Sequence, residues 1–214
     1  MSKNTIVCMF SGGIDSSGVL HQLITDVDYR DRDLVVQHII LQNRENRAQA
    51  EMKSVTKIIE YYQKQHPERP FTYTESVFNT TGFAPLKADR FPFDMDVCAF
   101  MAGNIAVARK DVRQIAMGRT KTDVASGGDN FQQRMQRAQS IFKAVYSLES
   151  EPVPDYIFPV INMSKKEIWE MLPPEVQAAS WYCRHPQYQA DGSVKPCRQC
   201  ITCKEVVDFL PHVE

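Results

Sequence analysis

The 214-residue chain has almost no net charge, because 25 Lys and Arg residues stand against 26 Asp and Glu residues. A protein held to nucleic acid mainly by bulk charge is strongly basic, so we expect no stable nucleic-acid partner, although a local basic groove stays open. Long hydrophobic runs are absent as well. No apolar run approaches the roughly 20 residues that span a bilayer, so we expect no membrane partner.

Two common nucleotide-binding loops and the common hydrolase triad are also missing. The sequence contains neither G-x-x-x-x-G-K-[ST] nor G-x-G-x-x-G. The histidines His21, His38, His66 and His212 have no partners at the spacing of a metal site or of a Ser-His-Asp triad. We therefore assign catalysis to none of these four side chains.

The composition that remains is that of a soluble globular protein, with 43% hydrophobic and 24% charged residues. A chain of this length can bury a core without disulfide bonds. The opening residues MSKNTIVCMF lead directly into a glycine loop and predict a first strand rather than a signal peptide. We expect a cytoplasmic protein with reduced thiols, in which the isolated Cys8 and Cys98 fill the core.

Apolar periodicity predicts strands that alternate with helices along most of the chain. The expected strands are Ile6–Phe10, Leu34–Leu41, Phe71–Val77, Arg113–Met117 and Tyr156–Ile161. The expected helices are Ser16–Asp26, Glu45–Gln65, Pro92–Arg109, Asn130–Ser147 and Lys165–Leu172, the last preceded by a capping box of Ser164 and Glu167. In the second helix, Glu45, Arg47 and Lys53 are assigned to a solvated face.

This order predicts an α/β fold with a doubly wound, Rossmann-like parallel sheet and right-handed crossovers. Ligands in such sheets bind beyond the carboxyl ends of the strands. The Pro173-Pro174 pair is the best candidate boundary. It divides the chain into an α/β sheet domain, residues 1–172, and a cysteine-rich subdomain, residues 173–214.

The string SGGIDSS, residues Ser11–Ser17, lies between the first expected strand and helix. Its two glycines, Gly12 and Gly13, allow positive φ and close approach of a ligand to the backbone. Successive N–H groups and a helix N-terminus form an anion cradle, to which the three serine hydroxyls add donors. The loop therefore favours a phosphate chain over the alternative, an ordinary capped turn between a strand and a helix.

Four cysteines fall within the last part of the chain, at Cys183, Cys197, Cys200 and Cys203. Two overlapping C-x-x-C units and one more thiolate are typical of a tetrahedral Cys₄ zinc site. Such a site leaves no open coordination position, so the zinc is expected to be structural. Free thiols, an iron–sulfur cluster and a redox pair are the alternatives, and His185 could replace Cys183 as a ligand.

The SGGxDSS string resembles the signature of the N-type ATP pyrophosphatases, or PP-loop enzymes. That resemblance implies an adenine nucleotide alpha hydrolase-like fold, cleavage of ATP between the α and β phosphates, and transfer of AMP to a substrate oxygen. It implies that Asp15 helps to place Mg²⁺ or the phosphates. The ATP-binding residues it implies are Phe10, Ser11, Gly12, Gly13, Asp15, Ser16, Ser17 and Gly118.

The glycine loop and the C-terminal cysteines together resemble the 7-cyano-7-deazaguanine synthase family. The segment with Gly118, Thr122-Asp123, Ser126-Gly127 and Asp129 is similar to a family motif, with spacing that differs by one residue on each side of Ser-Gly. The family's Pro-Gly-Arg-Asn is replaced here by Pro92-Phe93-Asp94-Met95, and the linker between the first two zinc cysteines is longer than usual.

This resemblance implies that ATP adenylates the carboxylate of 7-carboxy-7-deazaguanine, that free ammonia forms the amide, and that a second ATP drives dehydration to the nitrile. It implies catalytic roles for Asp15 and Asp123, with Mg²⁺ bound alongside ATP and a homodimer left open. The substrate-binding residues that we expect are Arg90, Arg119, Asp123, Ser126, Gly127 and Asp129. Two alternatives remain: an enzyme that adenylates another base or a protein terminus, and a non-catalytic zinc module that binds nucleic acid.

Overall fold

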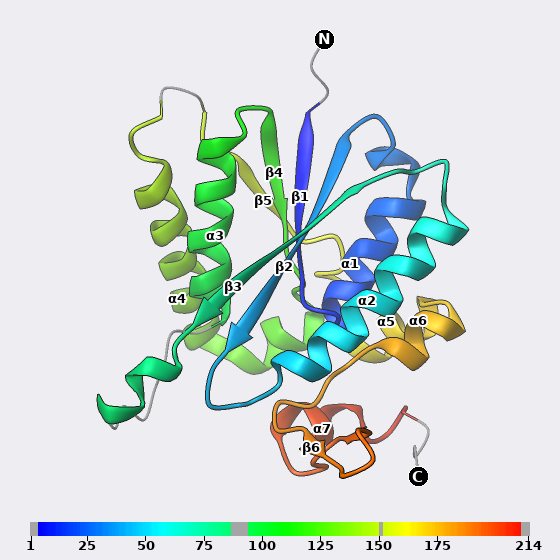
Figure 1. The fold of residues 1–214 in the computed structure, drawn as a ribbon. Helices are drawn as coiled ribbons and strands as arrows, with labels where there is room; N and C mark the ends of the chain where they lie inside the picture. Colours follow the sequence, from blue (N-terminus) through cyan, green and yellow to red (C-terminus); the bar gives the residue numbers. More distant parts are fainter. Residues whose placement is uncertain (1–3, 87–93, 150–151, 211–214) are drawn as a thin grey trace.

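The computed structural model describes residues 4–86, 94–149 and 152–210. Its centre is a sheet of five parallel strands in the order β3-β2-β1-β4-β5 (Figure 1). This confirms the predicted doubly wound sheet, and the strand order reverses between β1 and β4, where such sheets bind ligands. The strands are β1 (Thr5–Phe10), β2 (Asp33–Gln42), β3 (Thr72–Asn79), β4 (Val112–Ala116) and β5 (Asp155–Ile157).

Helices cover both faces of the sheet (Figure 1). One face carries α1 (Ile14–Thr25), α2 (Ala48–Gln65), α5 (Lys165–Met171) and α6 (Pro174–Ala179). The other face carries α3 (Asp94–Ala108) and α4 (Lys121–Tyr146). Two short 3₁₀ helices, η1 (Val27–Tyr29) and η2 (Thr81–Leu86), follow α1 and β3.

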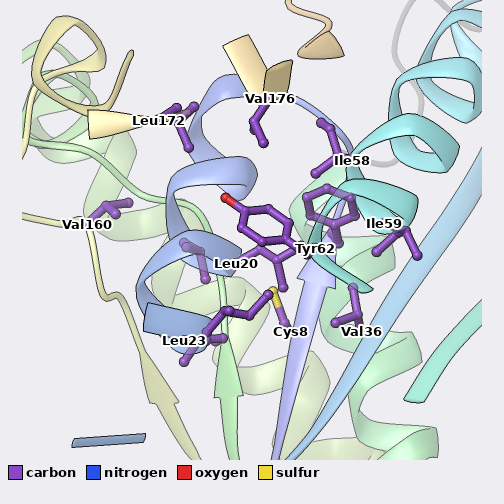
Figure 2. Close-up of a cluster of buried hydrophobic side chains, with 14 of the residues drawn as sticks. Cys8, Leu20, Leu23, Val36, Ile58, Ile59, Tyr62, Val160, Leu172 and Val176 are labelled. Atoms are coloured by element: carbon purple, nitrogen blue, oxygen red, sulfur yellow. The ribbon is translucent and has the colours of Figure 1, made fainter. Parts of the chain in front are cut away.

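The central strand β1 is buried along its whole length, as the apolar run predicts for a strand covered on both faces. Ile6 and Cys8 point into the cluster beneath α1 and α2, whereas Val7 and Met9 point into the cluster beneath α3 and α4. Figure 2 shows the first cluster, in which side chains of strands β1 and β2 meet those of helices α1, α2 and α6 around Tyr62. This layer supports the back of the glycine loop.

Small side chains let α3 and α4 pack closely on the second face. Ala99, Ala102 and Ala106 of α3 are buried, and a Cβ atom added at Gly103 would lie 2.8 Å from Cβ of Val145. The pair therefore tolerates little increase in side-chain volume at its contact.

The largest departure from the predicted elements is α4, which begins at Lys121 rather than at Asn130. A capping box formed by Thr120 and Asp123 starts the helix, and the Lys121 N–H donates to the Met163 carbonyl at 2.9 Å. The segment from Gly118 to Asp129, which precedes the predicted helix, is thus helical from its fourth residue onward. Strand β5 is also shorter than predicted, because turns at Ile161 and Met163 end it.

The C-terminal segment forms a small unit at the carboxyl edge of the sheet (Figure 1). It contains a hairpin of β6 (Gln187–Tyr188) and β7 (Val194–Lys195), followed by α7 (Ile201–Val206). Val176 and Val206 belong to the buried cluster beneath α1 and α2, so this unit is packed onto the sheet domain. The division at Pro173-Pro174 stays a prediction.

None of the helices in the described ranges is both long and apolar enough to cross a membrane. The 26-residue α4 has the necessary length, but its sequence is rich in Gln, Lys and Arg.

Gly18 sets the separation of α1 and α5. A Cβ atom added there would lie 2.5 Å from Cγ2 of Ile168 and 3.3 Å from Cγ1 of Val160. Because α5 begins with Lys165, the same contact places that side chain against the start of α1.

We expect Gly18→Ala to destabilise the protein by about 1–3 kcal/mol, because overpacking against Ile168 outweighs a gain in helix propensity of about 1 kcal/mol. Gly82→Ala is the matched control, since a Cβ atom there meets nothing within 4 Å in the described structure. Urea unfolding of the two variants beside the wild type measures the difference. A Gly18→Ala protein as stable as the wild type would contradict this close contact.

Candidate nucleotide site

The glycine loop connects β1 to α1 at the centre of the sheet's carboxyl edge. Gly12 has φ +73°, a left-handed conformation that favours glycine, whereas Gly13 has φ −82°. A Cβ atom on Gly12 would lie 2.7 Å from Ser54 Oγ, and one on Gly13 would lie 3.3 Å from the Trp181 carbonyl oxygen. The loop is therefore enclosed between α2 and the segment that follows α6.

The serines of the loop have different surroundings. Ser16 Oγ donates to the Gly13 carbonyl at 3.1 Å, lies 3.1 Å from Ser11 Oγ, and accepts from the Ser11 N–H at 3.2 Å. Ser17 is fully buried, and its hydroxyl accepts from Ser180 Oγ at 3.3 Å. Ser11 and Ser16 line two cavities that border the loop and are described below. The Ser17 hydroxyl faces away from them and bonds to Ser180, at the end of α6.

Asp15, in the first turn of α1, faces a buried cation. Its Oδ2 lies 3.8 Å from Lys165 Nζ, which also donates to Glu205 Oε2 at 2.5 Å. Asp15 Oδ1 is buried and has no hydrogen-bond partner among the described residues. The carboxylate thus keeps one oxygen for a ligand while the other is near a positive charge.

Burial raises the pKa of Asp15 to about 6. The Lys165 cation opposes this rise, and the carboxylates of Asp123 and Glu205 add to it. For Lys165 itself, burial lowers the pKa, but its two carboxylate neighbours outweigh burial and leave the pKa raised. Lys165 therefore stays protonated at neutral pH, when most of the Asp15 population is ionised.

Two cavities meet at the loop, since both are lined by Ser11, Asp15 and Ser16. The larger, about 230 Å³, lies between the ends of β1, β2 and β4 and the start of α3. Most of its wall is apolar and comes from Met9, Phe10, Ile39, Leu41, Met95, Val97, Cys98 and Met117. The smaller, about 150 Å³, is bordered by Lys165, Trp181, Tyr182 and Arg184. Cys8 is fully buried as predicted, and Cys98, also expected to fill the core, is partly buried against the second core cluster and lines the larger cavity as well.

The residues after β4 border the larger cavity. Gly118 approaches the start of α1 closely, because an added Cβ atom would lie 3.1 Å from the Asp15 backbone carbon. Arg119 lines the cavity, and its Nε is buried without a hydrogen-bond partner in the described part of the chain. Asp123 Oδ2 accepts from the Thr120 N–H at 3.0 Å and hydroxyl at 3.1 Å.

The remaining predicted substrate residues are only partly placed. The backbone of Ser126, Gly127 and Asp129 lies within α4. Arg90 falls outside the described residues.

A cluster of charged residues lies at the start of α2, and two of its members, Arg47 and Glu51, line both cavities. Arg47 is 11% exposed and pairs with Glu45 at 3.1 Å, with Glu51 at 3.3 Å and with Asp94. The assignment of Glu45 and Arg47 to solvent is therefore wrong, because α3 and the C-terminal unit cover this end of α2. Arg184, which follows Cys183, extends the cluster by pairing with Glu45 at 2.8 Å and Asp94 at 3.5 Å.

The charges in this cluster perturb one another. Burial raises the pKa of Glu51 to about 7, although the nearby Arg47 cation works against the rise. For Arg47, burial lowers the pKa, but the surrounding carboxylates of Glu51, Asp94 and Glu45 outweigh it and leave the pKa raised. No periodic pattern in the sequence marks the residues of this cluster as a site. Lys165 was also missed, but the Ser164 capping box, which follows a predicted strand, could have located it at the carboxyl edge of the sheet.

The fold brings all four clustered cysteines together. The sulfur atoms of Cys183, Cys197, Cys200 and Cys203 all lie within 4.8 Å of one another, and Cys197 and Cys203 are 3.9 Å apart. Four such donors could hold a metal ion. The Cys197 sulfur also accepts from the Cys200 N–H at 3.3 Å.

Comparison with known proteins gives a likeness in structure alone. No protein-family model and no curated protein matches the chain. A U34-tRNA thiolase, NcsA from Methanococcus maripaludis, solved with its [4Fe-4S] cluster, is similar over 97% of this chain, with a TM-score of 0.56 and 15% identity. NMN synthetase from Francisella tularensis is similar over 82% of this chain, with a TM-score of 0.46 and 13% identity.

This chain spans 65% of the length of either neighbour. At 15% identity the likeness to the thiolase bears on the fold and not on the reaction. The chain has a five-stranded, Rossmann-like parallel sheet similar to that of the thiolase, with four cysteines near its C-terminus that could bind a metal.

Proposed function

We propose that the protein binds Mg·ATP, cleaves it between the α and β phosphates, and transfers AMP to an oxygen atom of an acceptor. The observation that carries this proposal is the position of the glycine loop, where two cavities meet beside Lys165 and Asp15. Backbone N–H groups at the start of α1, the Ser11 and Ser16 hydroxyls and the Lys165 ammonium group are donors suited to a phosphate chain.

The two cavities suit the two halves of ATP. The larger cavity has the apolar wall that a purine ring requires, so adenosine would lie between β1, β2 and β4. The phosphates would then extend along the loop into the smaller, polar cavity beside Lys165. Phe10 and Gly118 would contact the nucleoside, as the resemblance to PP-loop enzymes implies. The buried hydroxyl of Ser17 would support the loop rather than contact ATP.

Asp15 would hold the Mg²⁺ that accompanies ATP, because its free Oδ1 is a carboxylate oxygen, the ligand type that Mg²⁺ prefers. The ion would offset the negative charge of the phosphates. Asp123 is the second proposed catalytic carboxylate, although its Oδ2 is engaged by Thr120. In this arrangement, Lys165 would stabilise charge on the departing pyrophosphate.

For the acceptor, we propose 7-carboxy-7-deazaguanine, on the joint presence of the SGGIDSS loop and the C-terminal cysteines. Its carboxylate oxygen would attack the α-phosphorus and release pyrophosphate, and ammonia would displace AMP to form the amide. A second ATP would adenylate the amide oxygen with release of pyrophosphate, and loss of AMP and of both amide protons would leave the nitrile. Arg119 lines the larger cavity and would pair with the carboxylate of this substrate. The other proposed contacts are Arg90, Ser126, Gly127 and Asp129.

A second candidate is adenylation of a different acceptor. Where the resembled family has Arg-Asn, α3 here begins with Asp94, whose carboxylate already pairs with Arg47 and Arg184. Asp94 and Glu51 both line the larger cavity, so this wall carries negative charge that would repel a carboxylate substrate. An acceptor with N–H groups directed at Asp94 would suit this wall.

We propose that the four cysteines hold one structural zinc ion. Four thiolates at about 2.3 Å from a tetrahedral zinc lie about 3.8 Å from one another. The separations found here, 3.9 Å for one pair and at most 4.8 Å for all pairs, fit a single ion. A [4Fe-4S] cube placed among the four thiols requires wider spacing. The zinc would fix the fold of this unit, and no reaction step would involve it.

We expect the purified protein to release pyrophosphate from Mg·ATP when an acceptor is present, and Asp15→Asn to reduce the rate at least a hundredfold. Because burial raises the pKa of Asp15 to about 6, wild-type turnover should increase as the pH rises through 6, when the carboxylate loses its proton. The variant should lack this step. Asp28→Asn, at an exposed carboxylate, is the control. Full turnover by folded Asp15→Asn would defeat the assignment.

The acceptor can be tested by incubation with Mg·ATP, ammonia and 7-carboxy-7-deazaguanine, followed by mass spectrometry of the base. We expect the amide and then the nitrile. If protein that binds ATP yields neither product, the acceptor is a different molecule, and the second candidate function, adenylation of another acceptor, is favoured.

Metal analysis of protein purified without added metal should give about one zinc per chain. Cys197→Ser should lower this content and expose the remaining thiols to titration, because three thiolates bind zinc more weakly than four. Cys8→Ser, at a buried thiol outside the cluster, should keep its zinc. Iron with acid-labile sulfide in place of zinc, or four freely titratable thiols in the wild type, would refute the zinc site.

A further inference from the structure

Two donors hold the carbonyl group of Gly12 from behind the loop. The Ser54 hydroxyl donates to Gly12 O at 2.7 Å, and the Trp181 N–H donates to the same oxygen at 2.9 Å. Ser54 is buried on α2, while Trp181 precedes the first cysteine of the metal cluster. The Trp181 side chain is fixed in turn, since its Nε1 donates to the Cys183 carbonyl at 2.7 Å.

The anchoring of this oxygen decides where the next N–H group points. The peptide bonds of the described residues are trans, and a trans peptide directs its C=O and N–H to opposite sides. With Gly12 O fixed toward α2 and Trp181, the Gly13 N–H faces the smaller cavity, which Gly13 lines. Its nearest acceptor, Ser11 Oγ, is 3.4 Å away, beyond the usual range of about 2.7–3.2 Å, so this N–H can still donate to an anion.

Because residue 12 is a glycine, the orientation of the Gly12–Gly13 peptide depends on the two hydrogen bonds to the Gly12 carbonyl. Gly12 is at φ +73° and carries no side chain that would restrict rotation of the following peptide. If the peptide turned over, the Gly12 carbonyl would face the cavity and present a partial negative charge to a phosphate. Two hydrogen bonds to one oxygen prevent that rotation, and only one of them comes from a side chain.

We propose that Ser54 is a positioning residue for the nucleotide phosphates: its hydroxyl holds the Gly12–Gly13 peptide so that the Gly13 N–H faces a pyrophosphate group. This inference rests on the proposed function. It places part of the anion site on α2, a helix that the SGGIDSS string does not include.

The test compares the affinities of the full-length, metal-loaded protein for pyrophosphate and for adenosine by titration calorimetry. Ser54→Ala removes the side-chain anchor, so pyrophosphate affinity should fall about threefold to tenfold, in line with the loss of one hydrogen bond. Adenosine affinity should stay the same, because its cavity does not include Ser54. Thr56→Ala is the matched control on α2, since its exposed hydroxyl donates to Met52 O of the same helix, at 3.0 Å, and not to the glycine loop.

Ser54→Cys supplies a second reading, because a thiol fills similar space but is a weak donor. It should weaken pyrophosphate binding with adenosine unaffected, and it decides the question if Ser54→Ala does not fold. Unchanged pyrophosphate affinity in a folded Ser54 variant, or an equal loss for both ligands, would overturn the positioning role. A wild type that binds neither pyrophosphate nor ATP would instead refute the proposed function, and the inference with it.

Discussion

The buried ammonium group of Lys165 joins three helices that are distant in the sequence. It begins α5 and lies between Asp15 of α1 and Glu205 of α7. A buried cation without partners is unstable, whereas a cation with two carboxylates is compensated. The three helices must therefore dock together before the charge is satisfied, and Gly18 permits the close contact with α5 that this docking needs.

A second network repeats this arrangement on the other side of the loop. Arg47, which directly precedes α2, is surrounded by carboxylates of Glu51 in α2, of Glu45 before it and of Asp94 at the start of α3, and Arg184 completes the set. The two networks keep like charges close together, which is unfavourable without the intervening cations. Burial is the main cause of the raised pKa values of Asp15 and Glu51, and the neighbouring carboxylates add to it, so proton-sensitive groups lie where the two cavities meet.

Local patterns were enough to predict the sheet, the glycine loop and the cysteine cluster. Strand β1, the Ser164 capping box and the cysteine spacing each depend on neighbours within a few residues. The start of α4 did not follow from such patterns, because the glycines after Ser126 favour a loop, while a Thr120 cap and a bond to the Met163 carbonyl favour a helix. The charged cluster around Arg47 was missed for a related reason: only the folded chain brings α3 and Arg184 over that end of α2.

The cysteine cluster and the glycine loop are linked by Trp181 and by the residues that follow it. Trp181 bonds to the loop through its N–H and to Cys183 through its ring, and Arg184 borders the smaller cavity. Glu205, on the helix that carries Cys203, is the second partner of Lys165. A unit of this size has little core of its own, so a metal held by the four cysteines would stabilise it and keep these three groups in place. The cysteines would then act at a distance, by fixing the wall that borders the glycine loop.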